Sequence, residues 1–214
     1  MNTIAIVDYG MGNFHSVARA LRAAAPERDI RIARQAADID AAERVVFPGQ
    51  GAMPDCMRTL DASGLRDAVL RAARSKPLLG VCVGEQMLFE HSDEGNTASL
   101  GIFPGSVRRF AGPAFEAPPK GQARLKIPHM GWNPVHQTRA HALWADIAQD
   151  TPFYFVHSYY AVPHDPALIA GTSRHGADFC CAIAADNIFA VQFHPEKSAG
   201  PGLQMYRNFA RWQP

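Results

Sequence analysis

The chain has 214 residues, of which 47% are hydrophobic and 19% charged, an ordinary globular balance for a single large α/β domain over residues 1–214. A formal net charge of +1 gives no reason to expect nucleic acid or an anionic membrane as a partner. The N-terminus has no basic segment followed by an apolar one, and no apolar run approaches 18 residues. We therefore expect neither secretion nor a membrane span, and place the protein in the cytoplasm.

The cysteine pattern agrees with that location. Cys56, Cys82, Cys180 and Cys181 show no C-x-x-C spacing and two are adjacent, which suits neither a disulfide framework nor a zinc site. A metal site built from Cys180, Cys181 and His175 is disfavoured, because adjacent strand positions point to opposite faces. We expect reduced thiols, no metal ion and no cofactor.

The first ninety residues alternate between strand and helix patterns. Apolar runs at 3–7, 30–33, 44–47 and from 77 up to Cys82 predict buried strands, and helical spacing is found at 14–21 and 65–73. This alternation predicts an α/β fold with an open, mainly parallel sheet flanked by helices. The glycine turn at 8–13 is no dinucleotide fingerprint, since His15 stands where a third glycine is required.

The second half of the chain is less regular. Residues 91–101 and 111–122 are predicted loops, rich in polar residues, glycine or proline. Short strands are predicted at 107–110, 151–156, 168–172, 179–184 and 188–193, as antiparallel additions that make the sheet mixed. A final helix over 203–212 would cover it.

Cys82 lies between Gly80 and Gly84, after an apolar strand and before a helix-like segment that runs to Phe89. Gly-x-Cys-x-Gly lets the backbone turn sharply from strand to helix and lifts the central side chain into a cleft, the arrangement of a nucleophile elbow. A following helix N-terminus would favour thiolate over thiol. The alternative is a small buried hydrophobic residue, the common role of a free cysteine.

A second candidate is the loop that closes the 44–47 strand. Gly49 and Gly51 surround Gln50, and two glycines let a peptide N–H point into a cleft, as an oxyanion hole requires. Taken alone, the loop can equally be a simple turn.

The third candidate is His194-Pro195-Glu196. Pro195 disfavours the helical region at His194, and in an extended segment His194 and Glu196 share a face. The imidazole could then take the proton of Cys82 and return it to a leaving amine, while the carboxylate fixes the tautomer. Such a pair alone is often a solvated surface feature; with the elbow it predicts a catalytic triad.

These motifs resemble those of class I glutamine amidotransferases, over almost the entire chain. The segments 80–84 and 194–196 are typical of the class. The segments 8–13, 126–133, 155–159 and 192–198 resemble more narrowly the glutaminase subunits of imidazole glycerol phosphate synthases. The resemblance implies a triad of Cys82, His194 and Glu196 that hydrolyses glutamine through a glutamyl thioester.

The resemblance also implies roles for the surrounding residues. Gln86, Ser158 and Tyr159 would hold the α-amino and α-carboxylate groups of glutamine. The main chain of Gly49, Gln50 and Gly51, with the Val83 N–H, would form the oxyanion hole. Gln50 and Glu85 depart from residues common in the family. Neither departure changes one of the three triad residues.

By the same resemblance the ammonia passes to a separate cyclase subunit, a (β/α)8 barrel, in a heterodimer. The partner-contact candidates lie in or beside the subunit-specific segments: Asn13, Lys126, Trp132, Asn133, Tyr154 and Lys197. Ordinary surface or core packing is the alternative for each. Two rival functions stay open: the glutaminase of another amidotransferase or a γ-glutamyl hydrolase, and a noncatalytic binding protein that keeps the fold.

Overall fold

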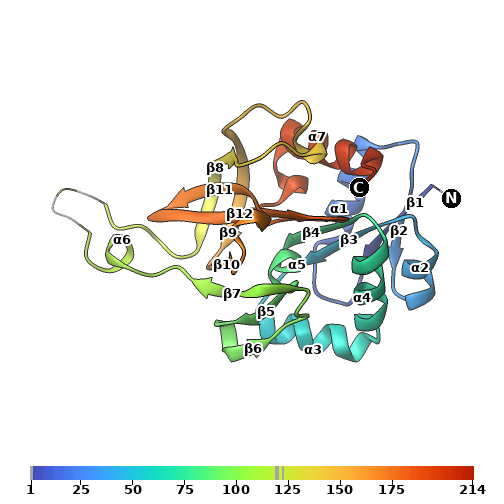
Figure 1. The fold of residues 1–214 in the computed structure, drawn as a ribbon, viewed down its shortest axis with the longest axis horizontal. Coiled ribbons are helices and arrows are strands. Elements are labelled where there is room, and N and C mark those ends of the chain that lie inside the picture. The colour runs from blue at the N-terminus through green and yellow to red at the C-terminus, as the bar shows by residue number, and fades with distance from the viewer. Residues whose placement is uncertain (1, 119–120, 122) are drawn as a thin grey trace.

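The computed structural model describes residues 2–118, 121 and 123–214, which form an α/β fold with one large and one small sheet (Figure 1). The N-terminal half alternates strands and helices, as the apolar periodicity predicts. Its elements are β1 (Thr3–Val7), α1 (Phe14–Ala24), β2 (Asp29–Ala33), α2 (Ala36–Ala41), β3 (Arg44–Gly49), α3 (Met53–Ser63), α4 (Arg66–Ser75), β4 (Leu78–Cys82) and α5 (Val83–Gln86).

The second half consists mainly of short strands. Its elements are β5 (Phe89–Ser92), η1 (Glu94–Asn96), β6 (Thr97–Ala98), β7 (Phe103–Arg109), α6 (Pro113–Glu116), β8 (His129–Gln137), η2 (Ala142–Trp144), β9 (Thr151–His157), β10 (Tyr159–Pro163), η3 (Pro166–Leu168), β11 (Ile169–His175), β12 (Ala177–Ala185), β13 (Ile188–Val191), η4 (Pro195–Lys197) and α7 (Ala199–Arg211).

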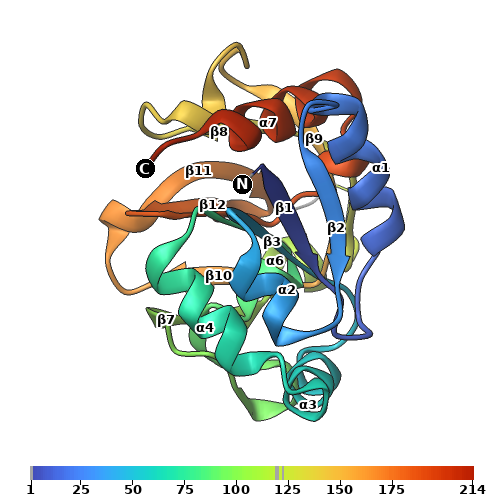
Figure 2. The ribbon, with the colours of Figure 1, turned by 90° about the vertical axis from the view of Figure 1, so that its right-hand side faces the viewer.

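The large sheet has the order β2-β1-β3-β4-β13-β12-β11-β8-β9, parallel from β2 to β13 and antiparallel beyond. Helices α1 and α7 pack together on one side of it, and α2 and α4 pack together on the other (Figure 2). Every residue of β3 and β4 is buried, as expected for parallel strands covered on both faces. The predicted α/β class with a mixed sheet flanked by helices is confirmed.

Strand β13 corrects one expectation. It was expected to join as an antiparallel strand, but it pairs in parallel with β4, Ile188 opposite Leu78 and Val191 opposite Val81, and antiparallel only with β12. The sheet therefore changes direction at β13. Because β4 and β13 are parallel neighbours, the residues that follow each strand leave the sheet at the same edge.

The predicted loop at 91–101 is also wrong in part. It holds the end of β5 and all of β6, which join β7 and β10 in the four-stranded sheet β10-β7-β5-β6. Strands of two and four residues are too short to show a period in the sequence. The predicted loop at 111–122 contains the short helix α6 on a projecting arm, and its residues 119–120 and 122 lie outside the described residues (Figure 1).

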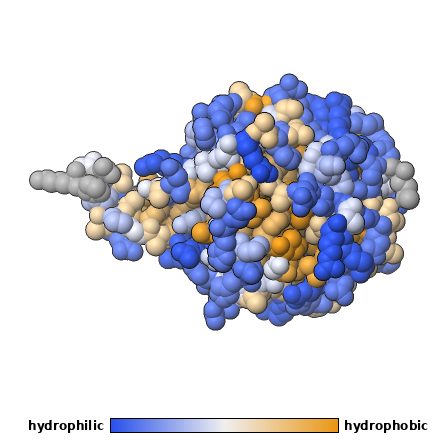
Figure 3. Space-filling view, viewed as in Figure 1, coloured by the Kyte–Doolittle hydropathy of each residue, from blue (hydrophilic) through white to orange (hydrophobic). Residues whose placement is uncertain are grey.

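The face shown in Figure 3 is mostly hydrophilic, with apolar side chains gathered near its middle. Within the described ranges, every helix is too short or too polar to cross a membrane.

The position of Gly84 generates a stability prediction. A Cβ added there would lie 1.9 Å from the main-chain oxygen of Phe47, so α5 and β3 would have to separate. We expect Gly84→Ala to lower the free energy of unfolding by about 3 kcal/mol or more, measured by urea denaturation. Gly200→Ala is the matched control, because its added Cβ would meet open space. Equal stability of the two variants would contradict the close packing at the turn after β4.

Candidate active site

Cys82 is the last residue of β4 and has φ 57° and ψ −115°, a backbone conformation that L-residues rarely adopt. The glycines on either side permit this turn. A Cβ at Gly80 would lie 2.8 Å from the Cβ of Ala190, and one at Gly84 would strike Phe47. The predicted nucleophile elbow is confirmed: the strained turn directs the Cys82 side chain toward a cavity.

The helix after the elbow is shorter than the sequence pattern predicts. Helix α5 has four residues, and Phe89 already begins β5, where it pairs with Phe103 of β7. A single turn has only a weak macrodipole. Stabilisation of a thiolate at Cys82 therefore depends on individual donors near the sulfur more than on a long helix.

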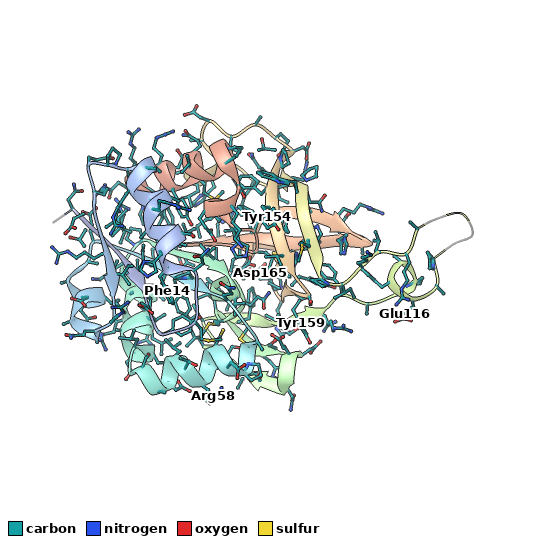
Figure 4. The ribbon with its side chains drawn as sticks, turned by 180° about the vertical axis from the view of Figure 1, so that it is seen from behind. Phe14, Arg58, Glu116, Tyr154, Tyr159 and Asp165 are labelled. Atoms are coloured by element: carbon teal, nitrogen blue, oxygen red, sulfur yellow. The ribbon has the colours of Figure 1, made fainter. Side chains whose placement is uncertain are left out.

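The cavity above Cys82 has a volume of about 290 Å³ and brings together nearly all the predicted catalytic and glutamine-binding groups. Gly49 does not line it but lies directly opposite Cys82 in the β3–β4 register. Figure 4 shows Tyr154 and Tyr159 in the body of the molecule, with Glu116 out on the arm. The lining residues are Gln50, Gly51, Cys82, Val83, Gln86, Glu94, Pro128, Val156, His157, Ser158, Tyr159, His194 and Lys197.

A larger cavity of about 530 Å³ lies at the base of the arm, lined by Arg109, Phe115, Arg124 and Lys126 among others. Its lining includes neither a cysteine nor a histidine. The smaller cavity is therefore the candidate active site.

His194 and Glu196 form the predicted pair. Nδ1 of His194 lies 2.8 Å from Oε1 of Glu196, and the Tyr206 hydroxyl donates to Oε2 at 3.4 Å. The local backbone differs from the expectation: only His194 is extended, and residues 195–197 form the 3₁₀ helix η4, with Pro195 at its start. The tight turn replaces strand alternation in bringing the two side chains together, because proline favours the first turn of a helix.

The other nitrogen of His194, Nε2, is buried and has no hydrogen-bond partner among the described residues. Burial alone lowers the pKa of His194, but the neighbouring Cys82 and the hydrogen bond to Glu196 outweigh it and raise the pKa to about 10. The site therefore favours the imidazolium form of His194 beside Cys82, so a charged proton donor already stands next to the candidate nucleophile.

Gln192 is a site residue to which the sequence analysis gives no role. Gln86 donates from Nε2 to the main-chain oxygen of Tyr159 at 3.0 Å and to Oε1 of Gln192 at 2.7 Å. Nε2 of the fully buried Gln192 then faces Sγ of Cys82 at 3.6 Å. Its position two residues before His194, on the strand side of the motif, is the signal that could have indicated it.

The Gly49–Gly51 loop packs directly against the elbow. A Cβ at Gly49 would lie 2.8 Å from the Gly84 nitrogen, and Gly51 has φ +110°. The main-chain oxygen of Gln50 accepts a hydrogen bond from the thiol of Cys56 at 3.4 Å. The loop is thus held beside Cys82, and its service as the oxyanion hole, with the Val83 N–H, stays a proposal.

The partner-contact candidates fall into two groups. Trp132 and Tyr154 are cross-strand neighbours on β8 and β9 with ring centroids 6.2 Å apart, and Nζ of Lys197 lies 5.8 Å from the Tyr154 ring. Met130 and Trp132 are the exposed large hydrophobic residues among those described. Asn13 precedes α1, which packs against η4.

The second group consists of Lys126, which precedes β8, and Asn133, which follows Trp132 on β8 and so lies on the other face of the strand. The main-chain oxygen of Lys126 interacts with His175 at 2.9 Å, and Asn133 lies 3.3 Å from His129. The structure therefore brings Trp132, Tyr154 and Lys197 together and separates Asn133 from them.

Comparison with known proteins agrees with this geometry. The family model for class I glutamine amidotransferases matches residues 5–212. The chain belongs to the class I glutamine amidotransferase family. The imidazole glycerol phosphate synthase subunit HisH of Dechloromonas aromatica is 60% identical to this amidotransferase over 212 residues, covering 99% of this chain and 97% of that one. The subunit of the same name from Nitrosospira multiformis is 58% identical over the full length of both chains.

Solved structures show the same fold at lower identity. A putative GMP synthase protein from Thermoplasma acidophilum superposes with a TM-score of 0.69 and 20% identity, covering 99% of this chain and 93% of that one. A structure described as a glutamine amidotransferase gives a TM-score of 0.71 and 14% identity over 98% and 99% of the two chains. These likenesses support the fold of the amidotransferase.

Glu85 is an unusual group in this site. Its side chain is fully buried next to the elbow, and neither carboxyl oxygen has a hydrogen-bond partner among the described residues. Burial, with a smaller contribution from the charge of Cys82, raises its pKa well above the ordinary value. The folded amidotransferase therefore holds the proton of this carboxyl to a higher pH than the unfolded chain does.

This burial predicts a pH-dependent stability. Above about pH 4.5 the unfolded chain releases the Glu85 proton while the folded chain keeps it, so stability falls as pH rises toward the folded pKa. Glu85→Met removes the group, and its stability advantage over the native chain should grow by about 1.4 kcal/mol per pH unit in that window. Urea denaturation between about pH 5 and pH 8 measures it.

The matched control is Glu116→Met, since Glu116 is exposed on α6. Its stability relative to the native chain should not change with pH in the same way. A difference between Glu85→Met and the native chain that stays constant with pH would mean that Glu85 is ionised in the folded state.

Proposed function

We propose that this chain is the glutaminase subunit of an imidazole glycerol phosphate synthase: it hydrolyses glutamine at Cys82 and passes the ammonia to a cyclase subunit in histidine biosynthesis. The observation that carries the proposal is one cavity that joins Cys82 on its strained elbow to the His194–Glu196 pair and Gln86. Full-length identities of 58–60% to subunits named HisH support the choice of synthase.

The first half-reaction makes a thioester. The Cys82 thiolate attacks the side-chain amide carbon of glutamine, forming a C–S bond and an oxyanion. We assign stabilisation of the oxyanion to the Val83 N–H and the loop of Gly49, Gln50 and Gly51, each donor contributing roughly 3 kcal/mol. When the C–N bond breaks, the His194 imidazolium gives its proton to the departing nitrogen, which leaves as ammonia.

The second half-reaction regenerates the enzyme. Neutral His194 takes a proton from water, and the hydroxide attacks the thioester carbonyl. Breaking the C–S bond releases glutamate and returns the Cys82 thiolate. Glu196 keeps Nδ1 of His194 protonated throughout, so that Nε2 is the nitrogen that exchanges protons with substrate and water.

Binding of the glutamine backbone is assigned to the far side of the cavity, to Gln86, Ser158 and Tyr159. Both hydrogen atoms of the Gln86 amide are directed at Tyr159 and Gln192. No described residue donates to Oε1 of Gln86, which leaves this oxygen free to accept from the α-ammonium group of glutamine.

The ammonia needs a nearby acceptor site, because in water near neutral pH it becomes ammonium and loses its nucleophilic lone pair. We assign that site to a cyclase subunit, a (β/α)8 barrel bound in a cytoplasmic heterodimer with one amidotransferase domain spanning residues 1–214. There the ammonia would yield imidazole glycerol phosphate and aminoimidazole-carboxamide ribonucleotide. The exposed Trp132, with Tyr154, Lys197 and Asn13, forms the proposed contact face, and the candidates Lys126 and Asn133 belong to the separate second group.

The decisive experiment measures glutamate release by the purified chain, first without and then with the cyclase subunit plus its nucleotide ligand. We expect the cyclase subunit to stimulate release, and Cys82→Ala to lose at least a thousandfold in rate, because the thioester cannot form. Cys181→Ala is the control for removal of a buried thiol outside the cavity lining. Stimulation by a different synthase in place of the cyclase would reject the assignment, and full activity of Cys82→Ala would reject the mechanism.

The raised pKa of His194 predicts the alkaline limit of activity. Activity requires the imidazolium, so kcat/KM should fall as pH rises toward the His194 pKa of about 10. Glu196→Gln removes one of the groups that raise this pKa, so the alkaline limb should move down by about 1–3 pH units. The maximal rate should also fall roughly 10²–10⁴-fold. A pH profile of glutamate release by the native chain and by Glu196→Gln tests this. If Glu196→Gln is slower but its alkaline limb stays where it is in the native chain, a group other than His194 sets that limb.

A further inference from the structure

A chain of hydrogen bonds runs beneath the glutamine cavity, through two histidines that the mechanism does not use. Nδ1 of His157 lies 2.8 Å from the main-chain oxygen of Tyr159, and its Nε2 lies 3.0 Å from Nδ1 of His129. Nε2 of His129 lies 3.3 Å from Nδ2 of Asn133, which also donates to the main-chain oxygen of Arg174 at 2.8 Å. His129 and His157 are direct cross-strand partners on β8 and β9.

The direction of every proton in this chain follows from its ends. The oxygen of Tyr159 can only accept, so Nδ1 of His157 carries the proton and Nε2 of a neutral ring is the acceptor. Nδ1 of His129 must then donate to it, which leaves Nε2 of His129 to accept from the Asn133 amide. Both rings are therefore in the Nδ1–H tautomer.

The surroundings keep both imidazoles neutral. Burial, with smaller contributions from nearby imidazoles, lowers the pKa of His157 to about 3 and that of His129 to about 4. Phe110 and Phe179 pack edge-on to His129, and Phe155 stacks on it. A second proton on either ring would place two N–H groups against each other in this dry setting.

The oxygen of Tyr159 is where this chain meets the catalytic groups. It accepts from His157 and also from Gln86, whose amide sets the orientation of Gln192 and so the donor that faces Cys82. A carbonyl oxygen held by two donors has both lone pairs occupied and is fixed in direction. Its position therefore depends on His157 remaining an Nδ1–H donor.

We propose that His129 and His157 are positioning residues for the glutamine site: His129, by donating to Nε2 of His157, locks His157 as the donor that holds the Tyr159 carbonyl and, through it, Gln86 and Gln192. The inference deepens the proposed glutaminase function and rests on it. His129 itself does not line the cavity, so it acts only through His157.

The test uses the tautomers and the kinetics of His129 variants. Nitrogen NMR of the imidazole rings in the native protein should show protonated Nδ1 and unprotonated Nε2 at both positions. His129→Leu removes the donor, so His157 should shift toward the Nε2–H tautomer, and the KM for glutamine should rise about five- to tenfold. His129→Asn places an amide N–H where Nδ1 was, and should restore the His157 tautomer and keep the KM within about twofold of native.

A second substitution separates positioning from packing. His157→Asn keeps an amide donor for the Tyr159 oxygen whatever His129 does, so adding His129→Leu to it should leave the KM almost unchanged. His141→Asn is the control: His141 is another imidazole whose pKa burial lowers to about 4, packed on Phe189 outside the cavity lining. It should leave the KM at the native value.

The outcomes are distinguishable. If the native chain with its cyclase subunit releases no glutamate, the proposed function fails, while the tautomers can still be read. If the native chain is active, an Nε2–H tautomer at either ring overturns the inference, as does an unchanged KM in His129→Leu. Should His129→Leu fail to fold, as a thermal melt would show, the native tautomers and the His129→Asn kinetics still decide it.

Discussion

The active site depends on the parallel pairing of β4 with β13. Val81 lies opposite Val191, so the two segments that follow, one turning at Cys82 and the other leading to His194, emerge from the same edge of the sheet. Strand β3, on the other side of β4, places Gly49 opposite Cys82 in the same way. Three segments far apart in the sequence thus deliver the nucleophile, the base and the loop to one point.

That edge also explains the need for glycine at two positions. The elbow turns so tightly that α5 lies against the carbonyl of Phe47, which leaves no room for a side chain at Gly84. Gly49 faces the same contact from β3, between the Gly84 nitrogen and the Tyr9 hydroxyl. The glycines are required by the close approach of two backbones, and the strain at Cys82 is held by the fully buried strands β3 and β13 on the two sides of β4.

Local patterns in the sequence predicted the buried strands, the elbow at Cys82 and the His194–Glu196 pair, because each depends on neighbours within a few residues. The length of α5, the direction of β13 and the small second sheet were missed, because tertiary pairing decides them. Phe89 illustrates this: its pairing with Phe103 ends the helix that local periodicity would extend.

The roles of Gln192 and His157 were missed for a related reason. Each belongs to a segment that the sequence marked, but its partners come from other strands, and register cannot be read from one strand alone. Conversely, Glu85 stood out in the sequence only as a departure from the family. Its burial without a hydrogen-bond partner among the described residues is what makes the stability of the fold depend on pH.

The site separates its ionisable groups into two kinds of environment. His194 is buried, yet its pKa is raised, because the neighbouring Cys82 and the hydrogen-bonded Glu196 outweigh the effect of burial. His129, His157 and Glu85 are buried without such charges, and burial shifts the pKa of each toward the neutral form.

Catalysis needs this separation. A charged His157 would repel the His194 imidazolium, whose influence already lowers the His157 pKa, and an ionised Glu85 would oppose the Cys82 thiolate. Keeping the neighbours neutral concentrates charge on the pair that reacts. The main-chain oxygen of Tyr159 is the acceptor shared by the Gln86 amide and the His157 imidazole, so it orients both side chains. A carbonyl oxygen has no proton to gain or lose near neutral pH, so it adds no charge to the site.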